Sequence, residues 1–289
     1  MPRGGDAAQH WWQQQHWLQQ RDRLRQAACR LQRVGHWTLA AILPMSCVFC
    51  GAETPPPARA LCSRCRTRLA ACQPARTCPR CAMPLPVVSN GMQADDGSQP
   101  RCVHCRKQPL RFARTFALGA YRGVLKEAVI LAKQPSRRVV AKTLAALLAQ
   151  HHGAALGQLG IDCVCPVPSH WRRRLKRRGT PSQVIAETLG RSLAVATRPL
   201  LRRIRHTRKQ GMLSPAQRRE NVDGSFAVNT GYVFSLTGFS PRGKHVLLVD
   251  DVLTTGATAN AAAGALRQAG ATEVTMVVLA RATGSRSPA

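Results

Sequence analysis

Long apolar runs and helix-like apolar periods alternate along the chain from residue 112 onward. Runs without polar alternation are typical of strands that are covered on both faces. Such strands are predicted at residues 116–121, 161–165, 245–249 and 274–280. Apolar residues at helical spacing predict helices between them, at residues 124–132, 139–151, 181–193 and 257–268. This alternation predicts an α/β domain with a mostly parallel sheet and helices on both faces.

The first 110 residues lack this alternation. Residues 44–110 are rich in proline and poor in long apolar runs, which predicts a small module without a large core. In the basic N-terminal part, Leu24, Ala28 and Leu31 are spaced as in an amphipathic helix, and a loosely ordered tail is the alternative. The predicted domains are therefore an extension at residues 1–43, the module at residues 44–110 and the α/β domain at residues 111–289.

The apolar stretch at residues 37–43 is far shorter than the roughly 20 residues that a membrane-spanning helix needs. No small-residue cleavage site precedes the cysteines, as it would after a secretory signal. We therefore expect a cytoplasmic protein without a membrane span.

Positive charge dominates the composition. Lysine and arginine number 43 against 13 aspartate and glutamate residues, a formal net charge of +30. Dense cationic runs occur at residues 171–178 and 202–209. Such a balance favours phosphates, nucleic acids or anionic lipids as partners without choosing between them. Aromatic residues are only 4% of the chain, so nucleic-acid binding is expected to depend mainly on charge.

Eight of the twelve cysteines form four Cys-x-x-Cys pairs. The pairs are Cys47/Cys50, Cys62/Cys65, Cys78/Cys81 and Cys102/Cys105. Two such pairs at zinc-ribbon spacing close a tetrahedral Cys₄ site, so we predict a double zinc-ribbon module with one or two structural Zn²⁺ ions. Disulfides or a redox pair are the weaker alternatives in a reducing cytosol. Cys72 is a spare, and Cys163 and Cys165 are expected to be buried as small apolar residues.

Two adjacent carboxylates, Asp250 and Asp251, follow the apolar run at residues 245–249. They stand at the carboxyl end of a predicted parallel strand, the edge at which open α/β sheets bind ligands. Hydroxyl-bearing and small residues come next, namely Thr254, Thr255, Gly256, Ala257 and Thr258. Their backbone N–H groups, at the start of a helix, suit an anion such as phosphate. Carboxylates that accept hydrogen bonds from ribose hydroxyls, beside a phosphate cradle, predict a sugar-phosphate site.

A second anion site is indicated at the same edge by Pro166, Val167 and Pro168, because rigid prolines there can hold a backbone loop open. A simple strand terminator is an equally consistent interpretation. Further along, residues 203–221 lack a clear period, which is typical of a long loop that is either functional or disordered.

Over residues 38–283 the chain resembles the ComF/GntX group, in which a cysteine-rich zinc module precedes a type I phosphoribosyltransferase-like domain. The resemblance rests on the four cysteine pairs, Tyr121-x-Gly123, Lys133, the turn at residues 166–168, Arg178-Gly179, residues 203–210 and 219–226, and the acidic pair with its Thr-Thr-Gly-x-Thr loop. It implies that the domain binds 5-phosphoribosyl 1-diphosphate (PRPP) with Mg²⁺. Asp250 and Asp251 are then the catalytic pair on the ribose hydroxyls, and residues 254–258 hold the 5′-phosphate. The remaining implied PRPP-binding residues are Val167, Pro168, Lys133 and Arg178.

Two departures from the family pattern lie near the implied diphosphate and acceptor side. Thr180-Pro181 stand where the family usually has an aromatic residue and Asn, and Gln134 follows Lys133 where Phe is common. These changes bear on catalytic turnover more than on PRPP binding.

Two functions from different classes stay open. The first is a PRPP-binding protein that handles or takes up single-stranded DNA in natural competence, together with proteins of the competence machinery. The alternative is an active phosphoribosyltransferase of base or nucleotide salvage, whose acceptor no motif identifies. Fold resemblance alone does not decide between them.

Overall fold

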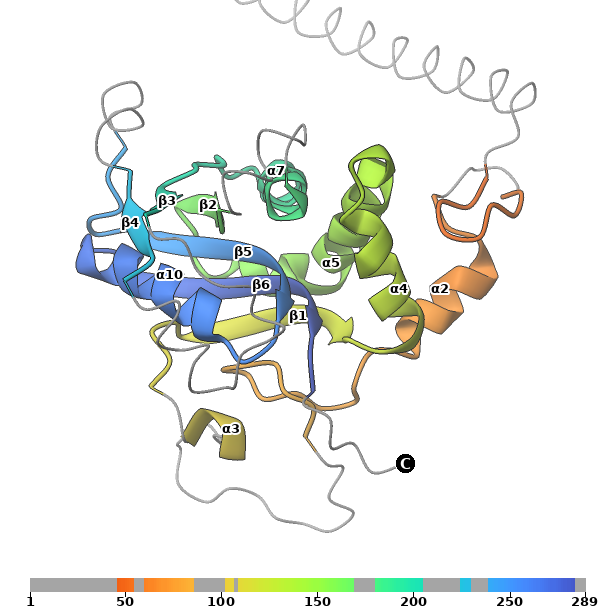
Figure 1. Cartoon of the computed structure of the whole chain (residues 1–289), viewed down its shortest axis with the longest axis horizontal. Helices are drawn as coiled ribbons and strands as arrows, with labels where there is room; N and C mark the ends of the chain where they lie inside the picture. Colours follow the sequence, from red (N-terminus) through yellow and green to blue (C-terminus); the bar gives the residue numbers. More distant parts are fainter. Residues whose placement is uncertain are drawn as a thin grey trace, which may run out of the picture. The chain divides into compact units, whose positions relative to one another are not determined.

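A four-stranded, all-parallel sheet carries the α/β part of the computed structural model (Figure 1). Its strands are β1 (Arg114–Ala120), β2 (Cys163–Pro166), β5 (His245–Leu253) and β6 (Glu273–Arg281). They lie in the order β1-β6-β5-β2, and each neighbouring pair is parallel. The predicted mostly parallel sheet is therefore confirmed.

The structure describes residues 46–54, 60–85, 102–106, 109–168, 180–204, 224–229 and 239–283. The chain separates into two units, Met1–Cys62 and Ser63–Ala289, and the sheet belongs to the second. The predicted extension at residues 1–43 lies outside the described residues, as do the basic residues 171–178 and 205–209. Within the described ranges, no helix has the length and apolar character needed to cross a bilayer.

Helices occupy most of the connections between the strands. The described helical segments are α2 (Ser63–Ala70), α3 (Val103–Arg106), α4 (Gly123–Ala132), the 3₁₀ turn η1 (Pro135–Arg137), α5 (Arg138–Gly157), α7 (Pro181–Leu193) and α10 (Ala257–Gln268). A short antiparallel pair joins β3 (Leu201–Arg203) to β4 (Phe226–Val228). The predicted bounds of α7 and α10 are confirmed, whereas α5 continues beyond its predicted end at residue 151 because Leu156 prolongs its buried face.

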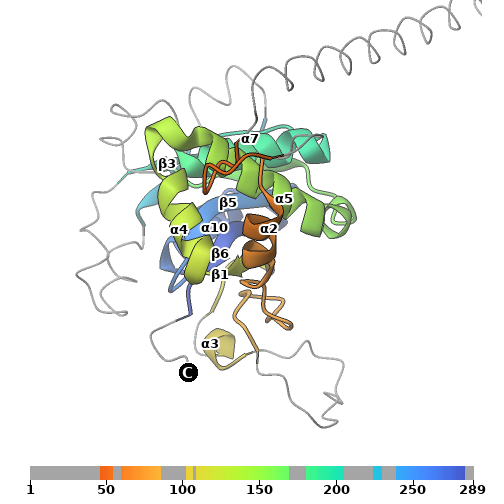
Figure 2. The ribbon, with the colours of Figure 1, turned by 90° about the vertical axis from the view of Figure 1, so that its right-hand side faces the viewer.

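Both faces of the sheet are covered, as its unbroken apolar strands predict. Val246 and Leu248 share one buried cluster with Ala262 of α10, while the alternate residues Leu247 and Val249 are fully buried toward the opposite face. The crossovers β5 to β6 and β1 to β2 run in opposite directions along the sheet, so right-handed connections place α10 on one face and α4 and α5 on the other. Figures 1 and 2 both show α5 beside α7 on one side of the strands.

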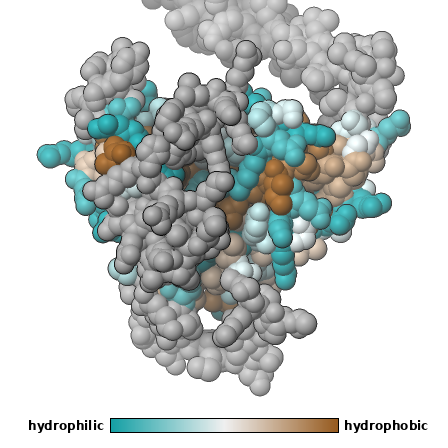
Figure 3. Space-filling model, in the orientation of Figure 1, coloured by the Kyte–Doolittle hydropathy of each residue, from teal (hydrophilic) through white to brown (hydrophobic). Residues whose placement is uncertain are grey.

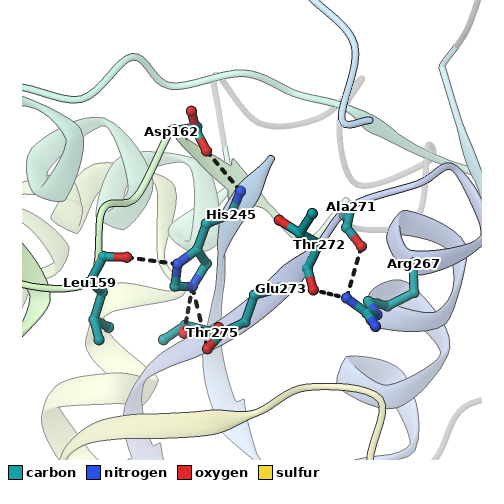
Figure 4. Close-up of polar contacts among 8 residues, drawn as sticks. All are labelled: Leu159, Asp162, His245, Arg267, Ala271, Thr272, Glu273 and Thr275. Atoms are coloured by element: carbon teal, nitrogen blue, oxygen red, sulfur yellow. Dashed lines mark hydrogen bonds and ion pairs between the residues drawn. The ribbon is translucent and has the colours of Figure 1, made fainter. Parts of the chain in front are cut away.

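The amino end of β5 is closed by a buried histidine (Figure 4). Nδ1 of His245 donates to the Leu159 carbonyl at 2.9 Å, and Nε2 is hydrogen-bonded to the Thr275 hydroxyl at 2.9 Å. The His245 backbone N–H and the Lys244 ammonium donate to the two carboxylate oxygens of Asp162, at 2.8 and 2.9 Å. These contacts tie the amino end of β5 to the segment before β2 and to β6. The carboxyl end of the same strand is left to the candidate site.

Apolar and polar residues are mixed on the described surface in Figure 3. Ile130 of α4 and Val139 of α5 are about half exposed, at 47% and 48%. Scattered exposed apolar side chains are common on protein surfaces, so these two do not by themselves indicate a binding site.

Candidate sugar-phosphate site and cysteine clusters

The acidic pair lies where the sheet narrows at its carboxyl edge. β2 ends at Pro166, which pairs with Val249, and the Val167 N–H donates to the Val249 carbonyl at 2.8 Å. From Asp250 onward β5 continues beside β6. The sequence predicted a strand that ends at residue 249, before the acids. The observed strand runs on to Leu253 instead, because β6 extends equally far beside it. β2 ends four residues earlier, at the partner of Val249, so Asp250 and Asp251 have β6 as their only neighbouring strand among the described residues.

A pocket of about 250 Å³ opens at this edge. It is lined by the predicted residues Lys133, Asp250, Asp251, Thr254, Gly256 and Thr258, and also by Tyr121, Val252, Leu253 and Ala259. Lys133 follows α4, whereas the acids lie in β5 and the loop follows it, so the fold brings together residues that are far apart in the sequence. Tyr121 was named in the sequence analysis only as part of the family pattern. In the fold it directly follows β1 and lines the pocket.

The two aspartates have different partners. Nζ of Lys133 lies 3.3 Å from Oδ2 of Asp251, while Oδ1 of Asp250 accepts a hydrogen bond from the Asp251 backbone N–H at 2.8 Å. Burial, followed by the neighbouring Asp251 charge, raises the pKa of Asp250 to about 8. Asp250 therefore holds a proton more tightly than an exposed aspartate does, whereas Asp251 is paired with a cation.

The phosphate loop, defined as residues 254–258, ends in the first turn of α10. Gly256 has a left-handed backbone, with φ of 84°, and is the N-cap residue of the helix. The Ala257 N–H donates to Oγ1 of Thr255 at 3.4 Å, and the Asn260 N–H donates to the Gly256 carbonyl at 2.8 Å. A helix amino terminus with small residues and hydroxyls around it favours an anion through its backbone N–H groups.

The turn after β2 is held from two sides. The Val167 carbonyl accepts from the Ser182 hydroxyl at 2.9 Å, and its N–H is bound to β5. Thr180 is the N-cap of α7, where its hydroxyl accepts from the Gln183 N–H at 3.3 Å, and Pro181 takes the first helical position. The Thr-Pro departure from the family pattern is thus a helix start. Pro168 follows in this turn but is not among the pocket-lining residues, and Arg178 lies outside the described residues.

The eight paired cysteines gather into two groups of four. The first cysteine cluster is Cys47, Cys50, Cys62 and Cys65, and the second is Cys78, Cys81, Cys102 and Cys105, with all Sγ atoms of a cluster within 4.8 Å of one another. Three Sγ pairs of the second cluster are 3.5 to 3.7 Å apart, and Cys50 and Cys62 are 3.7 Å apart. Four thiolates around zinc at about 2.3 Å place their sulfurs about 3.8 Å apart, whereas a disulfide needs about 2.05 Å. The donor set and spacing of both clusters fit a structural zinc ion.

Backbone N–H groups point at one thiol in each cluster. Burial raises the pKa of Cys47, but hydrogen bonds from the backbones of Cys50, Cys62 and Phe49 outweigh it and lower that pKa to about 6. The pKa of Cys78 is likewise lowered to about 7 despite burial, because backbone groups of the second cluster donate to its sulfur. Such donors stabilise a thiolate, the form that binds a metal.

Comparison with known proteins identifies the family. The family model described as Phosphoribosyl transferase domain matches residues 182–289. Competence protein F of Haemophilus influenzae is 30% identical over 185 residues, which cover 63% of this chain and 78% of that protein. The chain belongs to the ComF family.

Other ComF-like relatives match over a similar extent. DNA utilization protein YhgH of Salmonella typhi is 29% identical over 211 residues, which cover 71% of this chain and 83% of that protein. A solved structure, the glutamine PRPP amidotransferase from B. subtilis complexed with ADP and GMP, covers 53% of this chain and 30% of its own at 23% identity. The TM-score of this pair is 0.36.

The other cysteines in the described part of this ComF-family chain do not join the clusters. Cys163 and Cys165 are fully buried in β2, where burial raises the pKa of each thiol to about 12. This agrees with their predicted role as small apolar residues. Cys72 is buried as well, with its Sγ 3.5 Å from the Arg68 carbonyl and 3.6 Å from the Arg122 carbonyl.

Two polar residues near the phosphate loop were missed in the sequence. Arg281 ends β6 with 1% of its surface exposed, and His104 lies between Cys102 and Cys105. The sequence did contain a signal for Arg281, because it is a single cation at the end of an apolar strand. A buried strand of this kind leaves the cation in need of a polar partner. His104 offered no such signal, because a histidine in a cysteine-rich segment is common.

Proposed function

We propose that this ComF-family protein binds PRPP with Mg²⁺ at the carboxyl edge of its sheet and handles single-stranded DNA during uptake. The observation that carries the proposal is one pocket lined by Lys133, the acidic pair and the phosphate loop. The fold supports this placement, because ligands of open α/β sheets bind at that edge.

Different pocket residues are proposed to contact different parts of the sugar phosphate. Asp250 and Asp251 accept hydrogen bonds from the two ribose hydroxyls, and the first turn of α10 receives the 5′-phosphate. Lys133, already 3.3 Å from Asp251, supplies a cation beside the anionic ligand. Mg²⁺ arrives with the diphosphate, and carboxylate oxygens such as those of the acidic pair suit it as further ligands. The turn at Val167 and Pro168, together with Arg178, completes the proposed PRPP contacts.

The DNA part of the proposal is supported by the names of the relatives and by charge. One relative is a competence protein and another a DNA utilization protein. The formal charge of +30 exceeds what one PRPP molecule can neutralise, and phosphate backbones absorb such charge through counterion release. With few aromatic residues for base stacking, DNA binding should be steep in salt and weakly dependent on sequence. A cytoplasmic location and contact with competence-machinery proteins belong to the same proposal.

A second candidate, an active transferase, is favoured by the match of the phosphoribosyl transferase family model to residues 182–289. In that reaction a base nitrogen bonds to C1 of the ribose while the bond from C1 to the diphosphate oxygen breaks. The diphosphate leaves with the electron pair, and the base loses its proton. Such chemistry needs positioning and charge stabilisation more than a dedicated base.

The test is calorimetry of Mg²⁺ and PRPP with the full chain, using Asp250→Asn with Asp251→Asn. A hydrogen bond to a charged group such as the Asp251 carboxylate contributes about 1.5–3 kcal/mol, so the double variant should lose at least about tenfold in affinity. Glu127→Gln, which removes an exposed acid of α4, is the matched control and should bind normally. Unchanged affinity in the double variant would show that the carboxylates do not bind the ribose.

A salt titration of single-stranded DNA binding, with and without PRPP, separates the two candidates. Displacement of DNA by PRPP would place the nucleic acid at the carboxyl edge. A screen of candidate bases for diphosphate release completes the design. Failure to bind DNA at physiological salt, together with base-dependent diphosphate release, would replace the DNA-handling role with a conventional transferase.

A further inference from the structure

The guanidinium of Arg281 is buried between the second cysteine cluster and the phosphate loop. Its Nε donates to the Cys81 carbonyl at 2.8 Å. Its Nη1 donates to the Leu253 carbonyl at 2.7 Å, to the Thr254 carbonyl and to the Ala282 carbonyl at 2.9 Å. One side chain therefore holds both the Cys78/Cys81 knuckle and the backbone on which the loop begins.

The charge of Arg281 lacks a carboxylate partner. Among the residues that the structure describes, no acid forms an ion pair with it, and its buried Nη2 has no hydrogen-bond partner. Burial of a cation without an opposite charge is unfavourable. The guanidinium instead adjoins the second cysteine cluster, through its contact with the Cys81 carbonyl. A zinc ion with four thiolates carries a net charge of about −2, which is the counter-charge that this guanidinium requires.

A second side chain makes a parallel link. His104 lies between Cys102 and Cys105, and its half-buried ring is hydrogen-bonded to the backbone of Thr255. Arg281 therefore holds the loop at Leu253 and Thr254, and His104 holds it at the next residue. The second cluster also shares a buried core with α10, the helix that follows the phosphate loop, through Cys78 and Cys81.

We propose that the second cysteine cluster controls sugar-phosphate binding, with Arg281 and His104 as positioning residues that transmit its metal occupancy to the phosphate loop. With zinc bound, the anionic cluster keeps Arg281 in place and the Leu253 and Thr254 carbonyls are held. When the metal leaves, the Cys78/Cys81 turn is no longer held by its sulfurs, and the Cys81 carbonyl that accepts from Nε loses its fixed position. Arg281 then relaxes toward water and releases the loop. This proposal rests on the proposed PRPP site.

The first test uses wild-type protein and measures both directions of the coupling. Removal of zinc with a chelator should lower PRPP affinity about tenfold, and saturating PRPP should slow zinc release, because coupling between two sites is reciprocal. Hydrogen exchange of residues 253–258 should rise on zinc removal even without PRPP. Since that arm contains no PRPP, its result is independent of the proposed function. Unchanged loop exchange after zinc loss from the second cluster would overturn the coupling.

Variants assign the coupling to Arg281. Arg281→Met keeps much of the side-chain length without charge, and it should weaken PRPP binding about tenfold, raise loop exchange and speed zinc loss from the second cluster. Arg281→Lys restores the charge without the planar fork and should recover part of the affinity. Cys47→Ser with Cys50→Ser removes zinc from the first cluster, which supplies none of these loop contacts, and should leave PRPP affinity unchanged. Equal losses in the Met and Lys variants, with normal zinc retention in both, would reduce Arg281 to a packing residue.

Discussion

Asp250 and Asp251 are neighbours with opposite electrostatic surroundings. Asp251 faces the Lys133 ammonium, while Asp250 is desolvated beside a like charge, so its pKa is raised. A carboxyl group whose pKa is raised by burial and a neighbouring charge is typical of ligand-binding and catalytic sites. Burial of an ionised Asp250 beside Asp251 is unfavourable, so ionisation of Asp250 lowers the stability of the unliganded protein.

Stability should fall as pH rises through the titration of Asp250. A carboxyl group with a raised folded-state pKa binds its proton more tightly when folded than when unfolded. Its stabilising contribution is therefore present at low pH and is lost as pH rises toward about 8. Asp250→Asn removes this dependence, so the difference in Tm between pH 6 and pH 8.5 should be smaller than in wild type. Differential scanning calorimetry measures it, with Glu127→Gln as the control. An identical pH dependence in Asp250→Asn would contradict the assignment.

The phosphate loop depends on one backbone conformation at the junction of β5 and α10. Gly256 has a φ of 84°, which other residues adopt only with strain. A Cβ added there would lie 3.9 Å from Cδ2 of Leu110, so the obstacle to substitution is the backbone conformation and not crowding. The loop amides therefore keep their direction only with glycine at this position.

Gly256→Ala should lower the free energy of unfolding by about 1–2 kcal/mol and also weaken PRPP binding. The matched control is Gly153→Ala in the middle of α5, where nothing lies within 4 Å of an added Cβ. That change should raise stability by about 0.5–1 kcal/mol, because alanine is the better helix former. Urea denaturation and calorimetry give both quantities. Equal stability changes in the two variants would show that the left-handed conformation at Gly256 is not required.

The second cysteine cluster is part of the same core as the sheet. Cys78, Cys81 and Cys105 are buried in one cluster with Leu248 of β5 and Met276 of β6. A metal held there stabilises the α/β unit as well as the segment that carries the cysteines, because metal binding is coupled to folding.

Protein purified under reducing conditions should contain about two zinc ions per chain, one for each Cys₄ cluster. Cys78→Ser with Cys81→Ser should remove one ion and lower Tm through the shared core. Cys47→Ser with Cys50→Ser should also remove one ion. Elemental analysis and thermal denaturation are the measurements. Near-zero zinc in wild type, with no change of Tm on chelation, would contradict both metal sites.

Local patterns in the sequence were sufficient for the strands and longer helices of the parallel sheet and for the kinds of chemistry, whereas the short elements α2, α3, β3 and β4 were not predicted. The unbroken apolar run at residues 245–249 predicted β5, and helical spacing predicted α10 with its observed bounds. The four Cys-x-x-Cys pairs indicated two Cys₄ sets, and the two sets of thiols do converge. These features depend on residues that are close in the chain, where backbone geometry limits what neighbouring side chains can do.

The tertiary structure decided which distant residues meet. The contact of Lys133 with Asp251 arises because β1, which leads into α4, lies in the same parallel sheet as β5. The extension of β5 to Leu253 depends on a neighbouring strand of equal length. Arg281 bridges the cysteines and the phosphate loop because β6 runs beside β5 and ends at the same edge. No local pattern specifies these contacts, since the order of strands follows from the burial of the whole sheet, and only that order brings the cation to its partners.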